Sequence, residues 1–161
     1  MTDDLRELYQ EVILDHSRRP RNRGQLGEES VHVHGDNPSC GDELGLWVRF
    51  SPDGGIEDIK FSGQGCAISQ ASASMMTLRV KGRSSDQAAQ LVGDIHRLLT
   101  GGPEAGLVSP DLGDLQLLQG VRHFPQRVKC ASLAWRALEE ALRLQAARLR
   151  EGQATTEEPG V

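Results

Sequence analysis

The chain has 161 residues, of which 37% are hydrophobic, and it carries a net charge of −5 at pH 7. This length is enough for one domain with a buried core, and the acidic balance argues against sequence-independent nucleic-acid binding, which needs a clustered positive field. No apolar run reaches the roughly 20 residues needed to cross a membrane, and the charged first residues lack the apolar region of a secretory signal.

The first predicted element is an amphipathic helix over residues 3–16, followed by a polar loop. Apolar side chains recur there at helical spacing, at Leu5, Leu8, Tyr9, Val12 and Ile13. His16 lies at the end of this helix, where we expect a capping cation, and Pro20 and Gly24 mark the loop. The segment also holds four arginines, Arg18, Arg19, Arg21 and Arg23. They are either a solvated basic loop or a contact surface for an acidic partner.

Three strand-like runs with alternating apolar residues come next. They cover residues 31–34, 44–50 and 59–61. Residues 51–55, with the sequence Ser-Pro-Asp-Gly-Gly, form a turn signal, so the second and third runs should pair as an antiparallel hairpin. His32 and His34 share one face of the first strand. They are candidate metal ligands, although a solvated strand face is the simpler interpretation.

The second half of the chain is predicted to be mainly helical. Helices are expected over residues 67–80, 84–100 and 131–149. Ser84 and Gln87 match a capping box at the start of the second of these helices. The stretch 103–124 is loop-rich, with a short apolar segment at Leu115, Leu117 and Leu118.

Strands followed by helices predict an α+β fold, in which helices pack against a small three-stranded antiparallel sheet. Residues 1–150 should form one domain, and residues 151–161 are polar enough to be a disordered tail. We expect the protein to be cytoplasmic, to bind neither membranes nor nucleic acids, and to keep its thiols reduced. The odd number of three cysteines also argues against a disulfide framework.

The three cysteines lie at positions that suit metal ligands. Cys40 lies in a loop with Pro and Gly, Asp42 follows two residues later, and Cys66 follows a glycine turn. Cys66 and Cys130 are both predicted to precede helices, where the helix dipole stabilises a thiolate. Zinc favours four ligands of thiolate, imidazole or carboxylate type. These four side chains, Cys40, Asp42, Cys66 and Cys130, therefore form a candidate zinc site.

Wide spacing leaves a structural alternative open, in which the three cysteines are small buried hydrophobic residues. The glycines beside Cys40 and Cys66 favour the metal site, because they allow the backbone to approach closely. Cys40 lies in a loop, so it is the candidate ligand that could most easily leave the metal in order to react. Asp42 should bind zinc more weakly than sulfur does. Zinc is redox-inert and keeps thiolates deprotonated, which suits a cysteine that accepts sulfur by nucleophilic attack.

Several long motifs resemble the SufU/IscU (NifU N-terminal-like) family of iron–sulfur cluster assembly proteins. They cover residues 12–16, 20–24, 37–42, 65–76 and 129–135. The resemblance extends from about residue 5 to about residue 145. It implies a small antiparallel sheet with helices packed against it, and a zinc or cluster site at Cys40, Asp42, Cys66 and Cys130.

The SufU branch of this family is favoured by the residues around the third cysteine. IscU proteins carry a histidine directly before that cysteine, and here the position is Lys129. The extra segment 112–122 and Arg127 also look like SufU. This branch implies a zinc-bound sulfurtransferase that takes sulfur from a cysteine desulfurase and delivers the persulfide to a separate scaffold complex.

Under this interpretation Cys40 accepts the sulfur while Asp42, Cys66 and Cys130 keep the zinc. Arg127 and the arginines of the N-terminal loop, Arg18, Arg19, Arg21 and Arg23, are predicted partner contacts. Two alternatives stay open. The same ligands could hold a transient [2Fe–2S] cluster, as in an IscU-type scaffold, or zinc could serve only to stabilise the fold.

Overall fold

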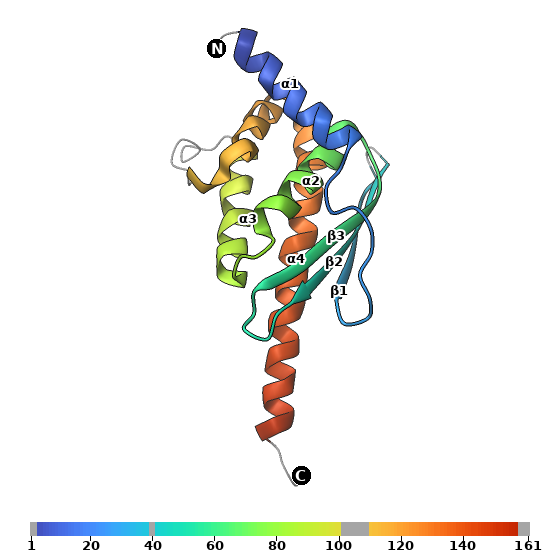
Figure 1. Cartoon of the computed structure of the whole chain (residues 1–161), viewed down its shortest axis with the longest axis vertical. Helices are drawn as coiled ribbons and strands as arrows, with labels where there is room; N and C mark the ends of the chain where they lie inside the picture. Colours follow the sequence, from blue (N-terminus) through green and yellow to red (C-terminus); the bar gives the residue numbers. More distant parts are fainter. Residues whose placement is uncertain (1–2, 39–40, 101–109, 158–161) are drawn as a thin grey trace.

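The structure is a computed structural model that describes residues 3–38, 41–100 and 110–157 (Figure 1). Strands come first and most helices follow, as the sequence predicts. The elements are α1 (Asp3–Arg18), β1 (Val31–Asn37), β2 (Asp42–Phe50), β3 (Ile56–Gln64), α2 (Ala67–Val80), α3 (Ser85–Thr100), the 3₁₀ segment η2 (Pro110–His123) and α4 (Pro125–Glu157). The α+β prediction is confirmed.

The sheet has the strand order β1-β2-β3, and both pairs are antiparallel. Alternate residues of β2, among them Leu46 and Val48, are fully buried beneath the helices. The predicted hairpin between β2 and β3 is confirmed, and its turn is closed by the Ser51 amide, which donates to the Gly55 carbonyl at 2.8 Å. α4 packs against β1 and β2, and α2 packs against β3 (Figure 1).

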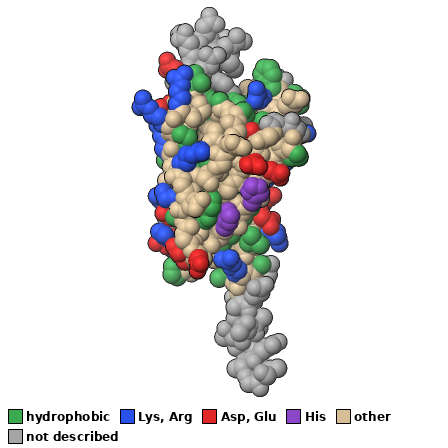
Figure 2. All heavy atoms as spheres, turned by 90° about the vertical axis from the view of Figure 1, so that its right-hand side faces the viewer, with side chains coloured by type: hydrophobic (Ala, Val, Ile, Leu, Met, Phe, Trp, Pro, Cys, Tyr) green, Lys and Arg blue, Asp and Glu red, His purple; other side chains and the backbone are tan. Residues whose placement is uncertain are grey.

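The outer face of the sheet is polar and carries the histidines of β1. His32 and His34 are exposed, and the His32 ring stacks on Trp47 of β2 with ring centroids 4.3 Å apart. On the face shown in Figure 2, histidines lie at the surface beside acidic groups, and basic and acidic side chains are interspersed. Among the described residues, no helix has the length and apolar character needed to cross a membrane.

The helix α2 is the centre of the molecule. α1, α4, β3 and η2 all pack against it, which explains why its middle is built of small residues, including the fully buried Ala71 and Ala73. Buried serines alternate with these alanines, and such hydroxyls need hydrogen-bond partners. Ser72 and Ser74 find theirs on α4 and on the segment around α1, respectively.

The capping box before α3 is also confirmed. The Ser84 amide donates to Gln87 Oε1 at 3.0 Å, and the Gln87 amide donates to Ser84 Oγ at 3.1 Å. These reciprocal bonds satisfy two amides that the first turn of the helix leaves unpaired. The start of α3 is therefore capped by residues of the local sequence.

The segment predicted to be loop-rich folds as 3₁₀ helix in its described part, residues 110–123. Its buried apolar residues recur at every third position, at Leu112, Leu115, Leu118 and Val121. Three residues per turn is the period of a 3₁₀ helix, so the sequence contained a signal that a search for helical or strand periods misses. Gly113, with φ 52° and ψ −129°, interrupts the segment.

α4 begins earlier and ends later than predicted. It starts at Pro125, because proline at a first helical position loses no hydrogen bond, and it runs to Glu157. Cys130 therefore lies inside the helix and does not precede it, which corrects the prediction that the helix start stabilises its thiolate. The predicted disordered tail, 151–161, is helical up to Glu157, and the remaining residues lie outside the described part. The boundary of the single domain near residue 150 stays a prediction.

Candidate metal centre

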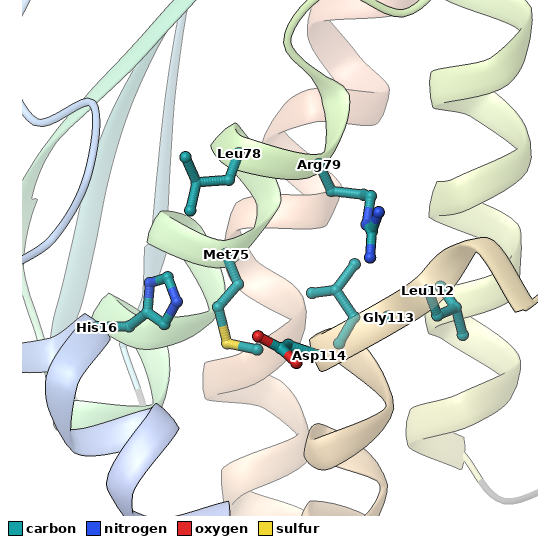
Figure 3. Close-up of a pocket in the computed structure, with 8 residues that line it drawn as sticks. His16, Met75, Leu78, Arg79, Leu112, Gly113 and Asp114 are labelled. Carbon is teal, nitrogen blue, oxygen red and sulfur yellow. The ribbon is translucent and has the colours of Figure 1, made fainter.

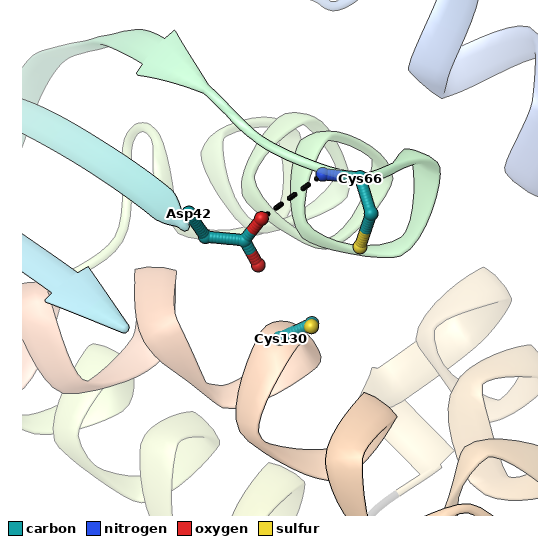
Figure 4. Close-up of side chains that lie close together, drawn as sticks. All are labelled: Asp42, Cys66 and Cys130. Atoms are coloured by element: carbon teal, nitrogen blue, oxygen red, sulfur yellow. Dashed lines mark hydrogen bonds between the residues drawn. The ribbon is translucent and has the colours of Figure 1, made fainter. Parts of the chain in front are cut away.

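Three of the four predicted ligands come together where the start of β2, the start of α2 and the helix α4 meet (Figure 4). Asp42 is the first residue of β2, Cys66 directly precedes α2, and Cys130 lies in α4. One ligand atom from each lies within 4.8 Å of the others. Cys40, the fourth predicted ligand, lies outside the described residues. The convergence on which the metal-site prediction depends is therefore present for three side chains from three distant parts of the chain.

The carboxylate of Asp42 is oriented by the start of α2. Asp42 is only 2% exposed, and its Oδ1 accepts a hydrogen bond from the Cys66 amide at 3.1 Å (Figure 4). Cys66 occupies the N-cap position with extended backbone, and its own side chain makes no cap. A carboxylate near a helix N-terminus is electrostatically favoured. The second oxygen of Asp42 points toward Cys130 (Figure 4).

Gly65 allows this close approach. A Cβ added there would lie 2.7 Å from Asp42 Oδ1 and would overlap the hydroxyl of Ser69. Ser69 Oγ donates to the Cys66 carbonyl at 3.0 Å, so moving it aside would break this hydrogen bond at the start of α2. The close backbone approach that the sequence predicts beside Cys66 is confirmed.

Ser72 connects the helix that follows Cys66 with the helix that contains Cys130. Its hydroxyl donates to the Ala131 carbonyl at 2.7 Å and accepts a hydrogen bond from Trp135 Nε1 at 3.1 Å. All three groups are buried, and Ala131 directly follows Cys130. Ser72 therefore fixes how far α4 lies from α2 at the thiols. Sequence reasoning missed Ser72, because a serine on a small-residue helix face carries no local signal of its partner.

Arg127 lies beside the two thiols. It precedes Cys130 by three residues on α4, a spacing that places both on one side of the helix. Charge and hydrogen-bond interactions with Cys66, and more weakly with Cys130, raise the pKa of Arg127. Arg127 was predicted to contact a partner, and the structure places it at the edge of the thiol cluster.

The other predicted partner contacts divide into two groups. Arg18 and Arg19 are exposed, whereas Arg21 donates to Asp15 Oδ2 at 2.6 Å. Arg23 donates to Gln70 Oε1 at 2.6 Å and to the Gly63 carbonyl at 2.7 Å. These bonds hold the turn that leads into Cys66. Whether any of the arginines meets a partner stays a prediction.

The histidines of β1 do not join the cluster. In residues 3–38, 41–100 and 110–157, no other group of three histidine, cysteine or acidic side chains is close enough to share an ion. His32 and His34 are thus part of the solvated strand face, the simpler of the two interpretations of the sequence.

The donor set suits zinc. Zinc–sulfur bonds are about 2.3 Å long and zinc–oxygen bonds about 2.0 to 2.2 Å, so two donors of one ion are less than about 4.6 Å apart. In a tetrahedral site such donors are about 3.3 to 3.8 Å apart, so the ligand atoms of Asp42, Cys66 and Cys130, all within 4.8 Å of one another, would move together by up to about 1 to 1.5 Å on binding. Two thiolates and one carboxylate fill three positions of a tetrahedron, and the fourth is left for another ligand.

This fold and this cluster define an α+β protein with a thiol-rich candidate metal site. The chain belongs to the family described as the NifU-like N-terminal domain, which it matches over residues 8–145. The resemblance seen in the motifs is therefore confirmed.

Relatives of the chain are named as an iron–sulfur cluster assembly scaffold and as a zinc-dependent sulfurtransferase. The scaffold protein IscU of Streptococcus pyogenes serotype M1 is 49% identical over 140 residues, which cover 86% of this chain and 85% of the relative. The zinc-dependent sulfurtransferase SufU of Bacillus subtilis strain 168 is 43% identical over 139 residues, which cover 86% of this chain and 92% of the relative.

A solved structure agrees with the fold. The crystal structure of a candidate scaffold protein for the SUF system of Fervidobacterium islandicum AW-1 matches with a TM-score of 0.73 and 34% identity, covering 84% of this chain and 97% of that one. Both the predicted sheet and the helices packed on it thus have a counterpart in a family member.

Proposed function

We propose that the chain is a zinc-dependent sulfurtransferase, which accepts sulfur from a cysteine desulfurase and delivers it to an iron–sulfur assembly scaffold in the cytoplasm. The observation that carries the proposal is the cluster of Asp42, Cys66 and Cys130, whose ligand atoms lie within 4.8 Å of one another. These three residues would hold the ion, and Cys40 would take the fourth position. Cys40 precedes Asp42 by two residues, so the same ion is within its reach.

Bound zinc would keep the thiolates deprotonated at neutral pH without oxidising them. The Cys40 thiolate attacks the terminal sulfur of a persulfide on the desulfurase. A new S–S bond forms on Cys40 while the S–S bond of the desulfurase breaks, and the desulfurase cysteine leaves as a thiolate. No external oxidant or reductant is needed. Asp42, Cys66 and Cys130 stay in place because each is fixed by β2, α2 or α4.

Charge around the site supports contact with an acidic partner surface. Arg127 lies beside the thiols and is exposed, as are Arg18 and Arg19. The guanidinium groups of Arg21 and Arg23 donate hydrogen bonds within the protein. We therefore propose Arg127, Arg18 and Arg19 as the direct contacts, and we assign Arg21 and Arg23 to shaping the surface.

The test is mass spectrometry of the protein after incubation with a cysteine desulfurase and cysteine. We expect one added sulfur that a thiol reductant removes, and we expect the Cys40→Ala variant to gain none. Zinc analysis of that variant is the control, because three remaining ligands should still retain metal. Equal sulfur uptake by Cys40→Ala and the natural chain would show that Cys40 is not the acceptor.

The second candidate function is a scaffold that assembles a transient [2Fe–2S] cluster on the same ligands. The scaffold name of the Streptococcus pyogenes relative favours it, and three thiolates with one oxygen are adequate donors for a labile cluster. Lys129 in place of a histidine ligand favours the sulfurtransferase. Anaerobic reconstitution with iron and sulfide, followed by cluster transfer to an apo-ferredoxin, distinguishes the two. Stoichiometric zinc in the purified protein supports the first, and iron with sulfide the second.

A further inference from the structure

A second polar site lies toward the other end of α2, away from Cys66. An open cleft of about 280 Å³ separates α1, α2 and η2 (Figure 3). Its lining residues are His16, Met75, Leu78, Arg79, Leu112, Gly113, Asp114 and Leu115. None of them belongs to the metal cluster. The volume is slightly below the range of about 300 to 1,000 Å³ that accommodates drug-sized ligands, so the cleft suits a smaller molecule.

His16 offers one hydrogen-bond donor to this cleft. It is 7% exposed, and its Nδ1 lies 2.7 Å from Ser74 Oγ. That hydroxyl also accepts the Arg21 amide at 2.8 Å, and within the described part of the chain it has no acceptor other than Nδ1. Since this hydroxyl already accepts one N–H, we assign it as the donor to Nδ1, which leaves the proton of the neutral imidazole on Nε2.

Arg79 and Asp114 supply one charge of each sign. The Arg79 guanidinium lies against Gly113, and a Cβ added to Gly113 would overlap it. The break of η2 at Gly113 therefore makes room for this side chain. Among residues 3–38, 41–100 and 110–157, neither Arg79 nor Asp114 has an ion-pair partner. Asp114 is near enough to His16 to act on it electrostatically.

The rest of the cleft is apolar. Met75, Leu112 and Leu115 are buried beneath it, and Leu78 is 54% exposed at its edge. The cleft thus combines a cation, an anion, a neutral N–H donor and a hydrophobic floor (Figure 3).

We propose that this cleft binds a free α-amino acid with an apolar side chain. The carboxylate of the ligand pairs with Arg79 and accepts a hydrogen bond from His16 Nε2, its ammonium group pairs with Asp114, and its side chain packs on Met75 and the leucines. Charge complementarity selects this class. A simple carboxylate would face Asp114 unpaired, and a simple amine would face Arg79 unpaired, and either mismatch costs binding free energy.

Isothermal titration calorimetry of the full chain with L-leucine tests the proposal. Two analogues serve as probes of the two charges: 4-methylpentanoate lacks the amino group, and 3-methylbutylamine lacks the carboxylate. We expect leucine to bind and each analogue to bind about tenfold more weakly or worse, as expected for the loss of one charge-assisted hydrogen bond. No heat with leucine at millimolar concentration, or equal binding of leucine and either analogue, overturns the assignment.

Variants locate the site. Arg79→Gln and Asp114→Asn should each weaken leucine binding by about tenfold, whereas the matched controls Arg136→Gln and Asp86→Asn, both at exposed positions, should not change it. An unchanged circular dichroism spectrum shows that each variant is folded. Leucine binding that persists unchanged in Arg79→Gln contradicts the proposal.

A further variant separates this cleft from the metal centre, because amino acids can themselves chelate zinc. Cys66→Ser should bind leucine as the natural chain does. If that substitution abolishes leucine binding, the amino acid is bound at the metal and the cleft is not its site. The proposed sulfur transfer is measured independently and is not affected by either result.

Discussion

The polar groups at the two ends of α2 differ in whether they are paired within the protein. At the end near Cys66, buried groups are paired within the protein: Asp42 accepts the Cys66 amide, and Ser72 bonds to both the backbone and the indole of α4. At the other end, Arg79 and Asp114 have no ion-pair partner among the described residues.

This difference explains how the metal donors come together. The proposed zinc ligands lie within 4.8 Å of one another, and once the two thiols lose their protons to bind an ion they repel each other and the carboxylate. Their positions must therefore be enforced by the backbone and by buried hydrogen bonds, with some help from Arg127. The cleft needs no such enforcement, because its charges have opposite signs and remain hydrated.

The largest expected effect is that of Cys130→Ser, which removes a proposed zinc ligand. We expect zinc affinity to fall by more than about 100-fold, since partners outside the ligand shell already contribute about 10- to 100-fold. Competition with a chromophoric chelator measures it, and Cys66→Ser should behave alike. Unchanged affinity in both variants would mean that the cluster does not bind the metal.

Gly65→Ala tests whether the close approach at Asp42 matters. The added Cβ would push the carboxylate away, so we expect a loss of about 1 to 3 kcal/mol in the free energy of unfolding and zinc affinity lower by about 10- to 100-fold. Gly93→Ala is the control, because the nearest atom to a Cβ there lies 3.5 Å away on the flexible end of Arg97. That change should be neutral or slightly stabilising. Chemical denaturation and chelator competition measure the two quantities, and equal behaviour of the two variants would contradict the proposed role.

Ser72→Ala removes the bridge between α2 and α4. It leaves the Trp135 indole N–H without its acceptor, so we expect a loss of about 1 to 3 kcal/mol in the free energy of unfolding, together with weaker zinc binding. Ser132→Ala is the matched control, because Ser132 donates to the Val128 carbonyl within its own helix and so connects no second element. If both variants have the same stability and zinc affinity, Ser72 does not set the helix spacing.

The smallest expected effect concerns His16 and pH. Burial lowers the pKa of His16 below its ordinary value of about 6.5, and its Nδ1 is bonded to Ser74 Oγ and not to a carbonyl at the end of α1, which corrects the prediction of a capping cation. The unfolded chain takes up this proton at a higher pH than the folded chain does. The resulting stability is complete above about pH 6.5 and is lost as the pH falls toward the folded pKa.

His16→Gln should therefore reduce the slope with which the free energy of unfolding falls between about pH 7 and pH 5. The reduction should be less than about 1.4 kcal/mol per pH unit, the limit for one proton. The exposed His96→Gln is the control. Urea denaturation at several pH values measures the slopes, and identical slopes for His16→Gln and the natural chain would exclude this contribution.

Local patterns in the sequence were sufficient for the strands, the hairpin turn and the capping box at Ser84, because period, turn residues and caps act over a few residues. The start of α4 was missed because its first turn, from Pro125, has no apolar period. η2 was missed because the period of three at Leu112, Leu115 and Leu118 belongs to a helix type that rarely runs so long.

By itself, the sequence determined the α+β order of elements, the family, and which side chains have the chemistry of metal ligands. Only the tertiary structure decided that Asp42, Cys66 and Cys130 meet, that Ser72 fixes their spacing, and that Arg79 and Asp114 face one cleft. The reason is that distance along the chain says nothing about distance in space. Which side chains come together depends on how β2, α2 and α4 pack, and that packing is determined by the whole core.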